Sequence, residues 1–217
     1  MALAIPLRQN QIEAAGRLHA RLTQWQMSDR VLERVRQTFP DFDTESTLLK
    51  IVTLNGLYGT NVLALIRVAG HVAHVMAEAD INAAGLEIVE RMAAFPADSQ
   101  KGPRRLTSFA SKFAHFFIDS NRFPICDSYA AAMVSHHLKG TRGTKVHTKS
   151  YLAYVKDFHA LREGAGLACS TRELDHYLWL AGVYRDFRRG NKKINVDVRQ
   201  LIENPGKSAP DLRALLP

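Results

Sequence analysis

A lysine and an aspartate near the middle of this 217-residue chain are placed so that they could support covalent chemistry. Lys112 lies within a run of apolar and small residues, and Asp127 stands at the expected start of a helix. A desolvated lysine gives up its proton readily, and a neutral amine is a nucleophile. A carboxylate at a helix start is fixed and supported by the helix dipole, so it can stabilise a nearby positive charge. The ordinary alternatives are a solvated lysine and an aspartate that only caps its helix.

Two expected helices position this pair. The stretch from Arg105 to Leu138 predicts one helix before and one helix after a turn at residues 121–125. Pro124 in this turn stops the first helix. Because the turn is tight, we expect the lysine and the aspartate at the same end of a helix pair.

Apolar residues recur at helical spacing through almost the whole chain. Helices are predicted over residues 7–26, 29–39 and 62–78, among others. Ser28 is expected to cap the second of these, and Thr60 or Asn61 is a candidate cap for the third. Asp43 or Thr44 is expected to cap the helix between them, and Ser170 with Glu173 predicts a capping box for a helix over residues 172–189. Alternating strand-like runs are nearly absent. The fold class is therefore predicted to be all-α, with about ten helices in two lobes.

The composition of residues 96–104 predicts a linker, because the segment contains two prolines and one glycine and has no apolar pattern. We expect residues 1–217 to form a single functional unit of two lobes. One lobe spans roughly 41–95, and the other combines 1–40 with 104–217.

The charge balance predicts a polyanionic partner. The net charge is +8 and the isoelectric point is about 9.7, and nucleic acid is the commonest polyanion in a cell. No apolar stretch has the length of a membrane span, and the N-terminus lacks the pattern of a secretion signal. The two cysteines, Cys126 and Cys169, fit a reducing compartment. We therefore expect a cytoplasmic protein with no membrane association and, because histidine pairs lack further ligands at the right spacing, no metal.

Two segments around the lysine and the aspartate resemble the helix-hairpin-helix DNA glycosylases, the superfamily of 8-oxoguanine glycosylase and endonuclease three. In that family a hairpin of the form Leu-Pro-Gly-x-Gly-x-Lys leads into the helix that carries the catalytic lysine. A segment like Phe-Pro-Ile-x-Asp then delivers the catalytic aspartate. This chain reads LTSFASK at 106–112 and FPICD at 123–127, with Ser108 and Ala110 in place of the two hairpin glycines.

The resemblance covers roughly residues 48–138 and implies further roles. The loop at 57–61 corresponds to the loop that wedges into DNA, where Tyr58 would stack in the gap left by a flipped base. Asn61 would bond the orphaned partner base or merely cap a helix. The implied sites are catalytic Lys112 and Asp127, and DNA-binding Tyr58, Asn61, Ser108, Ala110 and Tyr129.

Other candidates come from the residues themselves. The basic segments 139–149, with Arg142 and Lys145, and 185–193 are expected to contact phosphates, or else to form solvated faces. His115 lies one helical turn from the lysine and could line a pocket or be an ordinary half-buried histidine. Trp179 could be a pocket wall or part of the core.

The resemblance implies an enzyme: a DNA N-glycosylase that flips out and excises a damaged or modified base, leaves an abasic site and has possible Schiff-base lyase activity. The chain resembles divergent branches of the family, including anti-phage enzymes that remove glucosylated hydroxymethylcytosine. We expect a monomer that acts on double-stranded DNA without a cofactor. The alternative is a non-catalytic all-α DNA-binding or protein-interaction module.

Overall fold

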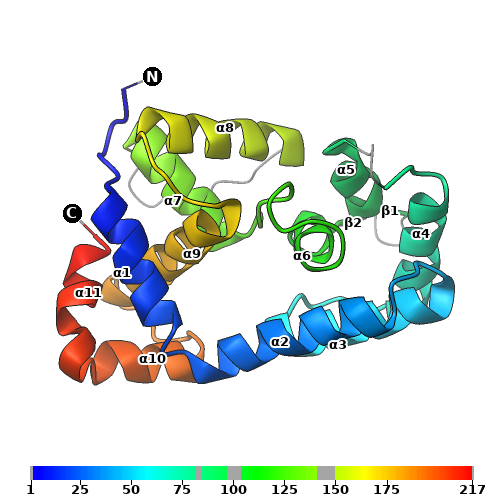
Figure 1. The fold of residues 1–217 in the computed structure, drawn as a ribbon, viewed down its shortest axis with the longest axis horizontal. Coiled ribbons are helices and arrows are strands. Elements are labelled where there is room, and N and C mark those ends of the chain that lie inside the picture. Colours follow the sequence, from blue (N-terminus) through cyan, green and yellow to red (C-terminus); the bar gives the residue numbers. More distant parts are fainter. Residues whose placement is uncertain (1, 82–84, 97–103, 141–149, 217) are drawn as a thin grey trace. The chain divides into compact units, whose positions relative to one another are not determined.

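The computed structural model describes residues 2–81, 85–96, 104–140 and 150–216. These residues form eleven α-helices, one 3-10 turn and one pair of very short strands, so the predicted all-α class is confirmed (Figure 1). Most of the predicted linker at 96–104 lies outside the described residues. The elements are α1 (Gln9–His19), α2 (Thr23–Thr38), α3 (Thr44–Tyr58), α4 (Leu65–Ala77), α5 (Glu87–Ala93), β1 (Ala94–Phe95), β2 (Arg104–Arg105), α6 (Thr107–Phe117), α7 (Ser128–Lys139), α8 (Tyr151–Gly164), α9 (Thr171–Arg188), α10 (Val196–Glu203), η1 (Gly206–Ser208) and α11 (Ala209–Ala214).

The chain divides into two compact units. The first unit comprises Met1–Met27, Asp127–Thr148 and Tyr154–Pro217, and the second comprises Ser28–Cys126 and Lys149–Ala153. Residues 41–95, predicted as one lobe, lie inside the second unit. The predicted lobe boundaries themselves stay a prediction.

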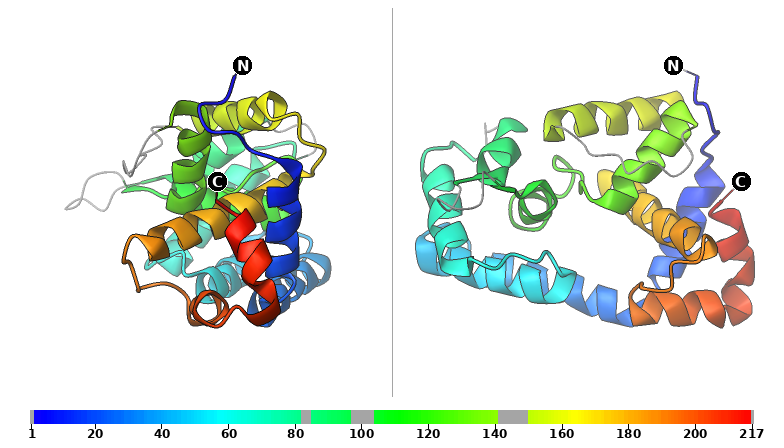
Figure 2. Two further views of the ribbon diagram at one scale, coloured as in Figure 1. Left: turned by 90° about the vertical axis from the view of Figure 1, so that its left-hand side faces the viewer. Right: turned by 180° about the vertical axis from the view of Figure 1, so that it is seen from behind.

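In the first unit α9 packs against α7 and α1, and α11 packs against α1 (Figure 2). A buried hydrogen-bond network joins these helices to the ends of the chain. His137 Nδ1 lies 3.0 Å from the Ile5 carbonyl oxygen, and its Nε2 lies 2.9 Å from the Tyr177 hydroxyl. Gln11 donates to the Leu215 carbonyl at 3.2 Å. Burial lowers the pKa of His137, so the ring is a neutral bridge between two oxygen partners.

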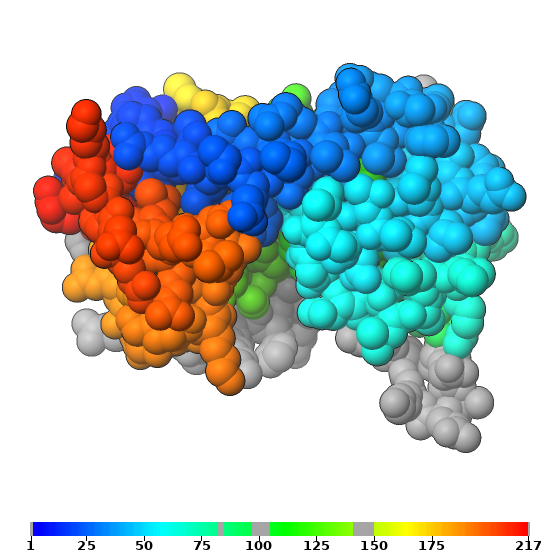
Figure 3. Space-filling model, turned by 90° about the horizontal axis from the view of Figure 1, so that it is seen from below, coloured from blue at the N-terminus to red at the C-terminus, as the bar shows by residue number. Residues whose placement is uncertain are grey.

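In the second unit α6 is the most enclosed helix, since nine of its eleven residues are buried. It packs against α3 and α5, and α4 packs against the same two helices. Phe109, Phe113 and Phe117 follow one another at one-turn intervals along α6, with ring centroids 5.9 and 5.1 Å apart. Residues of α3 and α4, drawn in cyan, share one outer face of this unit (Figure 3). Close packing on most sides of α6 restricts the movement of its backbone.

Several helix ends are set by capping residues that the sequence predicts. The Asp43 carboxylate accepts hydrogen bonds from two backbone N–H groups at the start of α3, and Asp127 does the same for α7. Ser170 and Glu173 form the predicted capping box of α9. Gly59 ends α3 in the left-handed conformation that glycine adopts most easily.

Three predicted helix starts and ends are wrong. Residues 7–26 do not form one helix, because α1 ends at His19. The backbone N–H groups of residues 21 and 22 bond carbonyls three residues earlier, as in a turn, and not four residues earlier, as in an α-helix. The next helix begins at Thr23, so Ser28 lies inside α2 and not at its start. Asn61 does not cap α4, which begins at Leu65; Asn61 instead adopts a left-handed backbone with φ of 56°.

Candidate active site

Lys112 lies on α6 in the second unit, and only 7% of its surface is exposed. Its amine donates a hydrogen bond of 3.0 Å to the hydroxyl of Ser108, one turn earlier on the same face of the helix. Ser108 itself is exposed in the first turn of α6. The lysine therefore has an enclosed stem and an amine directed toward the N-terminal end of its helix.

Ala110, predicted to approach a DNA phosphate, is completely buried. It offers no surface to a phosphate in this conformation, and its role in DNA binding stays a prediction. The hairpin position that remains accessible is Ser108. Ala110 faces the core of the second unit, where its small side chain allows neighbouring groups to pack closely against α6.

Asp127 is the N-cap residue of α7 in the first unit. One carboxylate oxygen, Oδ1, accepts hydrogen bonds from the backbone N–H groups of Tyr129 at 3.0 Å and Ala130 at 2.9 Å. The capping role considered from the sequence is thus confirmed. A carboxylate held this way keeps its orientation, and a fixed orientation is what stabilisation of a nearby cation requires.

The backbone that leads into Asp127 is held by side chains of the lysine helix. The Cys126 backbone N–H donates to the Ser111 hydroxyl at 3.0 Å, and Ser111 is the residue before Lys112. His115 Nδ1 lies 2.9 Å from the Phe123 carbonyl oxygen. His115 is only 1% exposed, so of its two predicted roles the structure favours the structural one.

A third side chain holds the same turn from the start of α8. Tyr151 is fully buried, and its hydroxyl donates to the Pro124 carbonyl at 3.0 Å. Glu90 on α5 fixes this helix start by accepting from the Ser150 hydroxyl at 2.7 Å and the Tyr151 backbone N–H at 2.5 Å. Glu90 also pairs with Arg105. The turn at residues 123–126 is therefore clamped at several backbone groups.

Replacement of Ser111 by alanine should destabilise the protein by about 1 to 3 kcal/mol, because the variant removes the buried acceptor of the Cys126 N–H. Urea unfolding followed by circular dichroism measures the change. Ser128→Ala, at an exposed position at the start of α7, is the matched control and should change stability by less than about 0.5 kcal/mol. Equal stability of the two variants would show that the Ser111 bond contributes nothing to the clamp.

Tyr58 is half-buried and anchored within the second unit. Its hydroxyl donates to the Asp29 carboxylate, and its ring lies 4.8 Å from that of Phe116, centroid to centroid. The loop after it is shaped by Asn55, which bonds both the N–H and the carbonyl of Val62, at 3.0 and 3.2 Å. The side chain presented to solvent is Leu63, which is 85% exposed.

Ile66, at the start of α4, is also 72% exposed, so two large apolar side chains stand at this end of the helix. The sequence did not predict their exposure, because the helix expected over residues 62–78 is apolar on most sides and so was expected to be buried. Asn61, in the loop before them, has a left-handed backbone with φ of 56°. Asn61 itself is exposed.

Tyr129 on α7 lies directly against Gly182 of α9 in the first unit. A Cβ atom on Gly182 would come within 2.8 Å of the Tyr129 Cβ, so only glycine allows this close contact. Burial raises the pKa of Tyr129, and the charges of Asp186 and Asp127 raise it further. The phenol therefore stays protonated and can donate a hydrogen bond, for example to a phosphate.

Comparison with known families gives one match. The family model HI_0787_N, described as an N-terminal domain, matches residues 11–121, which is just over half of the chain. The chain belongs to this family. The matched region includes Lys112 and ends before Asp127. No curated protein and no solved structure matches the chain.

The family region contains a second buried lysine, which sequence reasoning missed. Lys50 on α3 is fully buried, donates to the Asp41 carbonyl at 2.5 Å and lies 3.8 Å from the centre of the Phe42 ring. Burial lowers its pKa to about 8, although the charges of Asp43 and Asp41 oppose the shift. The sequence signal for its burial is its position inside the apolar run LLKIV at residues 48–52. Because no part of it is exposed, Lys50 cannot reach a substrate from this position.

Lys50 makes the stability of the protein depend on pH in the alkaline range. Its pKa is lower in the folded state than the roughly 10.4 of an unfolded chain, so the unfolded state binds more protons between these values. The cost of charging Lys50 is therefore present below about pH 8 and is relieved as pH rises toward 10. Over this window the unfolding free energy of the wild type should rise, relative to Lys50→Met, by at most about 3 kcal/mol. Urea titrations at pH 7 to 10 measure it, and parallel curves would contradict it.

The remaining predicted site residues are two cations after α7, a tryptophan on α9 and the basic segment at residues 185–193. Arg142 and Lys145 lie outside the described residues. Trp179 packs against Trp25 in the first unit, with ring centroids 4.6 Å apart. At the end of α9, Lys192 lies 3.5 Å from the centre of the Phe187 ring. The cations of this segment are Arg185, Arg188, Arg189, Lys192 and Lys193.

No helix in the described part of the chain combines the length and apolar character of a membrane span. His19 and His176 stack in the first unit with ring centroids 3.7 Å apart. Both are metal-ligating residue types, so the expected absence of a metal stays a prediction.

Proposed function

We propose that this protein is a DNA N-glycosylase with associated lyase activity, in which Lys112 is the nucleophile and Asp127 the electrostatic stabiliser. The observation that carries the proposal is the turn at residues 123–126. The lysine helix holds the backbone of this turn through Ser111 and His115, and the turn leads directly into the capping aspartate. The turn therefore follows the proposed nucleophile's helix along the chain and ends at the residue before the proposed stabiliser.

The proposed reaction begins with extrusion of the target base, which costs a few kcal/mol. As the N-glycosidic bond breaks, its electron pair leaves with the base, and the base takes a proton from solvent. The positive charge that develops on the sugar is stabilised by the Asp127 carboxylate. The Lys112 amine attacks C1′ and loses a proton to solvent. The C1′–O4′ bond then breaks, O4′ takes a proton from solvent, and the nitrogen lone pair forms the C1′=N bond of a Schiff base, which opens the route to strand cleavage.

Leu63 is proposed as the wedge residue in place of Tyr58. A large apolar side chain that is 85% exposed can fill the gap left by an extruded base, whereas the Tyr58 hydroxyl is engaged by Asp29. The cations at the end of α9 and the net charge of +8 support double-stranded DNA as the partner. The protein is proposed to act as a cytoplasmic monomer without a metal.

The experiment that tests the function is a base-release assay on a panel of duplexes. The panel includes 8-oxoguanine, uracil, alkylated bases and glucosylated hydroxymethylcytosine as found in phage DNA, with unmodified DNA as the control. The proposal expects release of a free base from at least one modified duplex and none from the control. Failure with the entire panel would oppose it.

A second candidate is a DNA-binding module without chemistry, favoured by the basic end of α9. It predicts DNA binding that weakens steeply with salt while no base is released. Measuring affinity on the same duplexes at about 50 and 200 mM salt separates the two candidates.

A further inference from the structure

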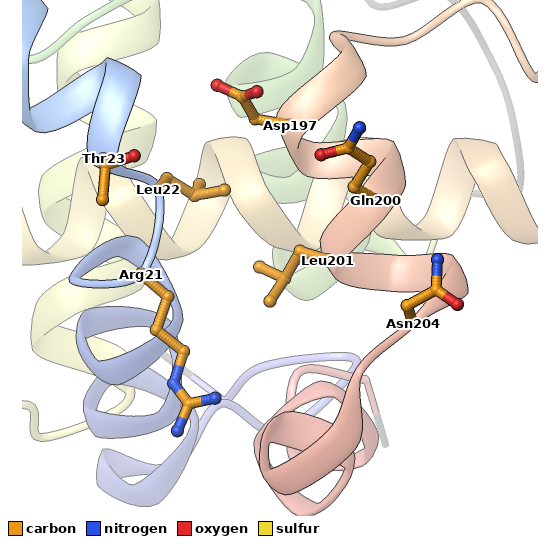
Figure 4. Close-up of a pocket in the computed structure, with 7 residues that line it drawn as sticks. All are labelled: Arg21, Leu22, Thr23, Asp197, Gln200, Leu201 and Asn204. Carbon is orange, nitrogen blue, oxygen red and sulfur yellow. The ribbon is translucent and has the colours of Figure 1, made fainter.

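A pocket in the first unit lies between the turn that joins α1 to α2 and the helix α10 (Figure 4). Its volume is about 480 Å³, which is within the range of small-molecule sites. On the outer face of the unit, the orange residues of α10 lie beside the blue residues of this turn (Figure 3). The lining residues are Arg21, Leu22, Thr23, Asp197, Gln200, Leu201 and Asn204.

Asp197 gives the pocket a polar group that lacks a partner. Its Oδ2 atom is buried and accepts no hydrogen bond from any described residue. The carboxylate is not needed as the helix cap, because the Asn195 side chain accepts from the backbone N–H groups of Asp197 and Val198 at 2.9 and 3.4 Å. A buried carboxylate oxygen without a donor is unfavourable, so the site is suited to a ligand that supplies an N–H donor.

Arg21 supplies the opposite charge. It makes no side-chain hydrogen bond or ion pair within the described part of the chain. Arg17, one turn earlier in the sequence, differs because Asp211 pairs with it at 2.9 Å. A guanidinium on a pocket wall with no acidic partner is suited to a carboxylate.

The two charged groups are separated by an apolar part of the pocket. Figure 4 shows the Arg21 and Asp197 side chains toward different ends, with Leu22 and Leu201 between them. Leu22 is 2% exposed and forms a firm apolar wall. A ligand that matches this order carries a cation at one end, a short apolar chain and an anion at the other end. A lone carboxylate is too few ligands for a divalent metal, and a simple anion would meet the charge of Asp197.

We infer that this pocket binds a small linear zwitterion, with its ammonium group at Asp197 and its carboxylate at Arg21. The amides of Gln200 on α10 and of Asn204, the residue directly after this helix, add hydrogen-bonding groups along the wall. The site lies within the first unit and does not depend on the glycosylase proposal. Its test therefore measures binding, not activity.

The test is calorimetric titration of the full chain with 6-aminohexanoate, compared with hexanoate and 1-aminohexane, each of which lacks one charge. We expect saturable binding of 6-aminohexanoate and dissociation constants about tenfold higher or more for either control ligand. Asp197→Asn and Arg21→Gln should each weaken 6-aminohexanoate to a similar degree. Arg17→Gln, which removes a neighbouring arginine that already has a partner, should leave its affinity unchanged.

Thermal unfolding of each variant, followed by circular dichroism, establishes that the variants are folded before they are titrated. No saturable binding of 6-aminohexanoate to the wild type would overturn the inference. So would equal affinity for the singly charged ligands, or equal weakening by Arg17→Gln and Arg21→Gln.

Discussion

Replacement of Lys112 by glutamine is expected to reduce strand cleavage at an abasic site by about 10²- to 10⁴-fold, the range for loss of a positioned catalytic side chain. Glutamine keeps much of the length of the side chain and can still bond the Ser108 hydroxyl, but it has no amine to attack C1′. Base release should fall less, because water can complete that step without a lysine. Denaturing gels measure cleavage, and chromatography of the freed base measures release.

Lys50→Gln is the matched control for this variant. Lys50 is also a buried lysine in the described part of the family region, but none of its surface is exposed. We expect it to change stability and its pH dependence without changing the cleavage rate of the folded protein. If Lys50→Gln loses cleavage while Lys112→Gln keeps it, the nucleophile has been assigned to the wrong lysine.

Replacement of Asp127 by asparagine is expected to slow base release by about 10²- to 10³-fold, the loss seen when one electrostatic stabiliser of a transition state is removed. Asparagine is as good an N-cap as aspartate, so α7 should keep its start and the stability should change by less than about 1 kcal/mol. The variant therefore removes the charge while it preserves the helix cap.

Asp127→Ala is the comparison that separates chemistry from capping. It loses both the charge and the acceptor for the Tyr129 and Ala130 N–H groups, so it should also lose about 1 kcal/mol of stability. Release rates are measured under single-turnover conditions, and stability by urea unfolding. Full activity in the asparagine variant with low activity in the alanine variant would reduce Asp127 to a helix cap.

The parts of the fold that sequence predicts well are those set by local chemistry. Asp43, Asp127 and the Ser170–Glu173 pair cap helices as expected, because a cap depends only on residues three or four positions away. The all-α class follows in the same way from apolar spacing. The break between α1 and α2 was missed because the apolar spacing continues across it.

The environment of each candidate residue depends on tertiary contacts that no local pattern contains. Tyr58 appeared suited to stacking in DNA, but Asp29 and Phe116 anchor it. Ala110 appeared suited to a phosphate, yet it faces the interior. Lys50 was overlooked because its amine contacts the Asp41 carbonyl and the Phe42 ring, two groups in the segment before α3.

The most direct test of the proposed chemistry is to map the covalent intermediate. The full chain is incubated with a duplex that carries an abasic site or a modified base, borohydride is added, and the peptide linked to DNA is identified by mass spectrometry. The proposal predicts a reduced adduct on Lys112. An adduct on a different amine, or none with any of these duplexes, would contradict it.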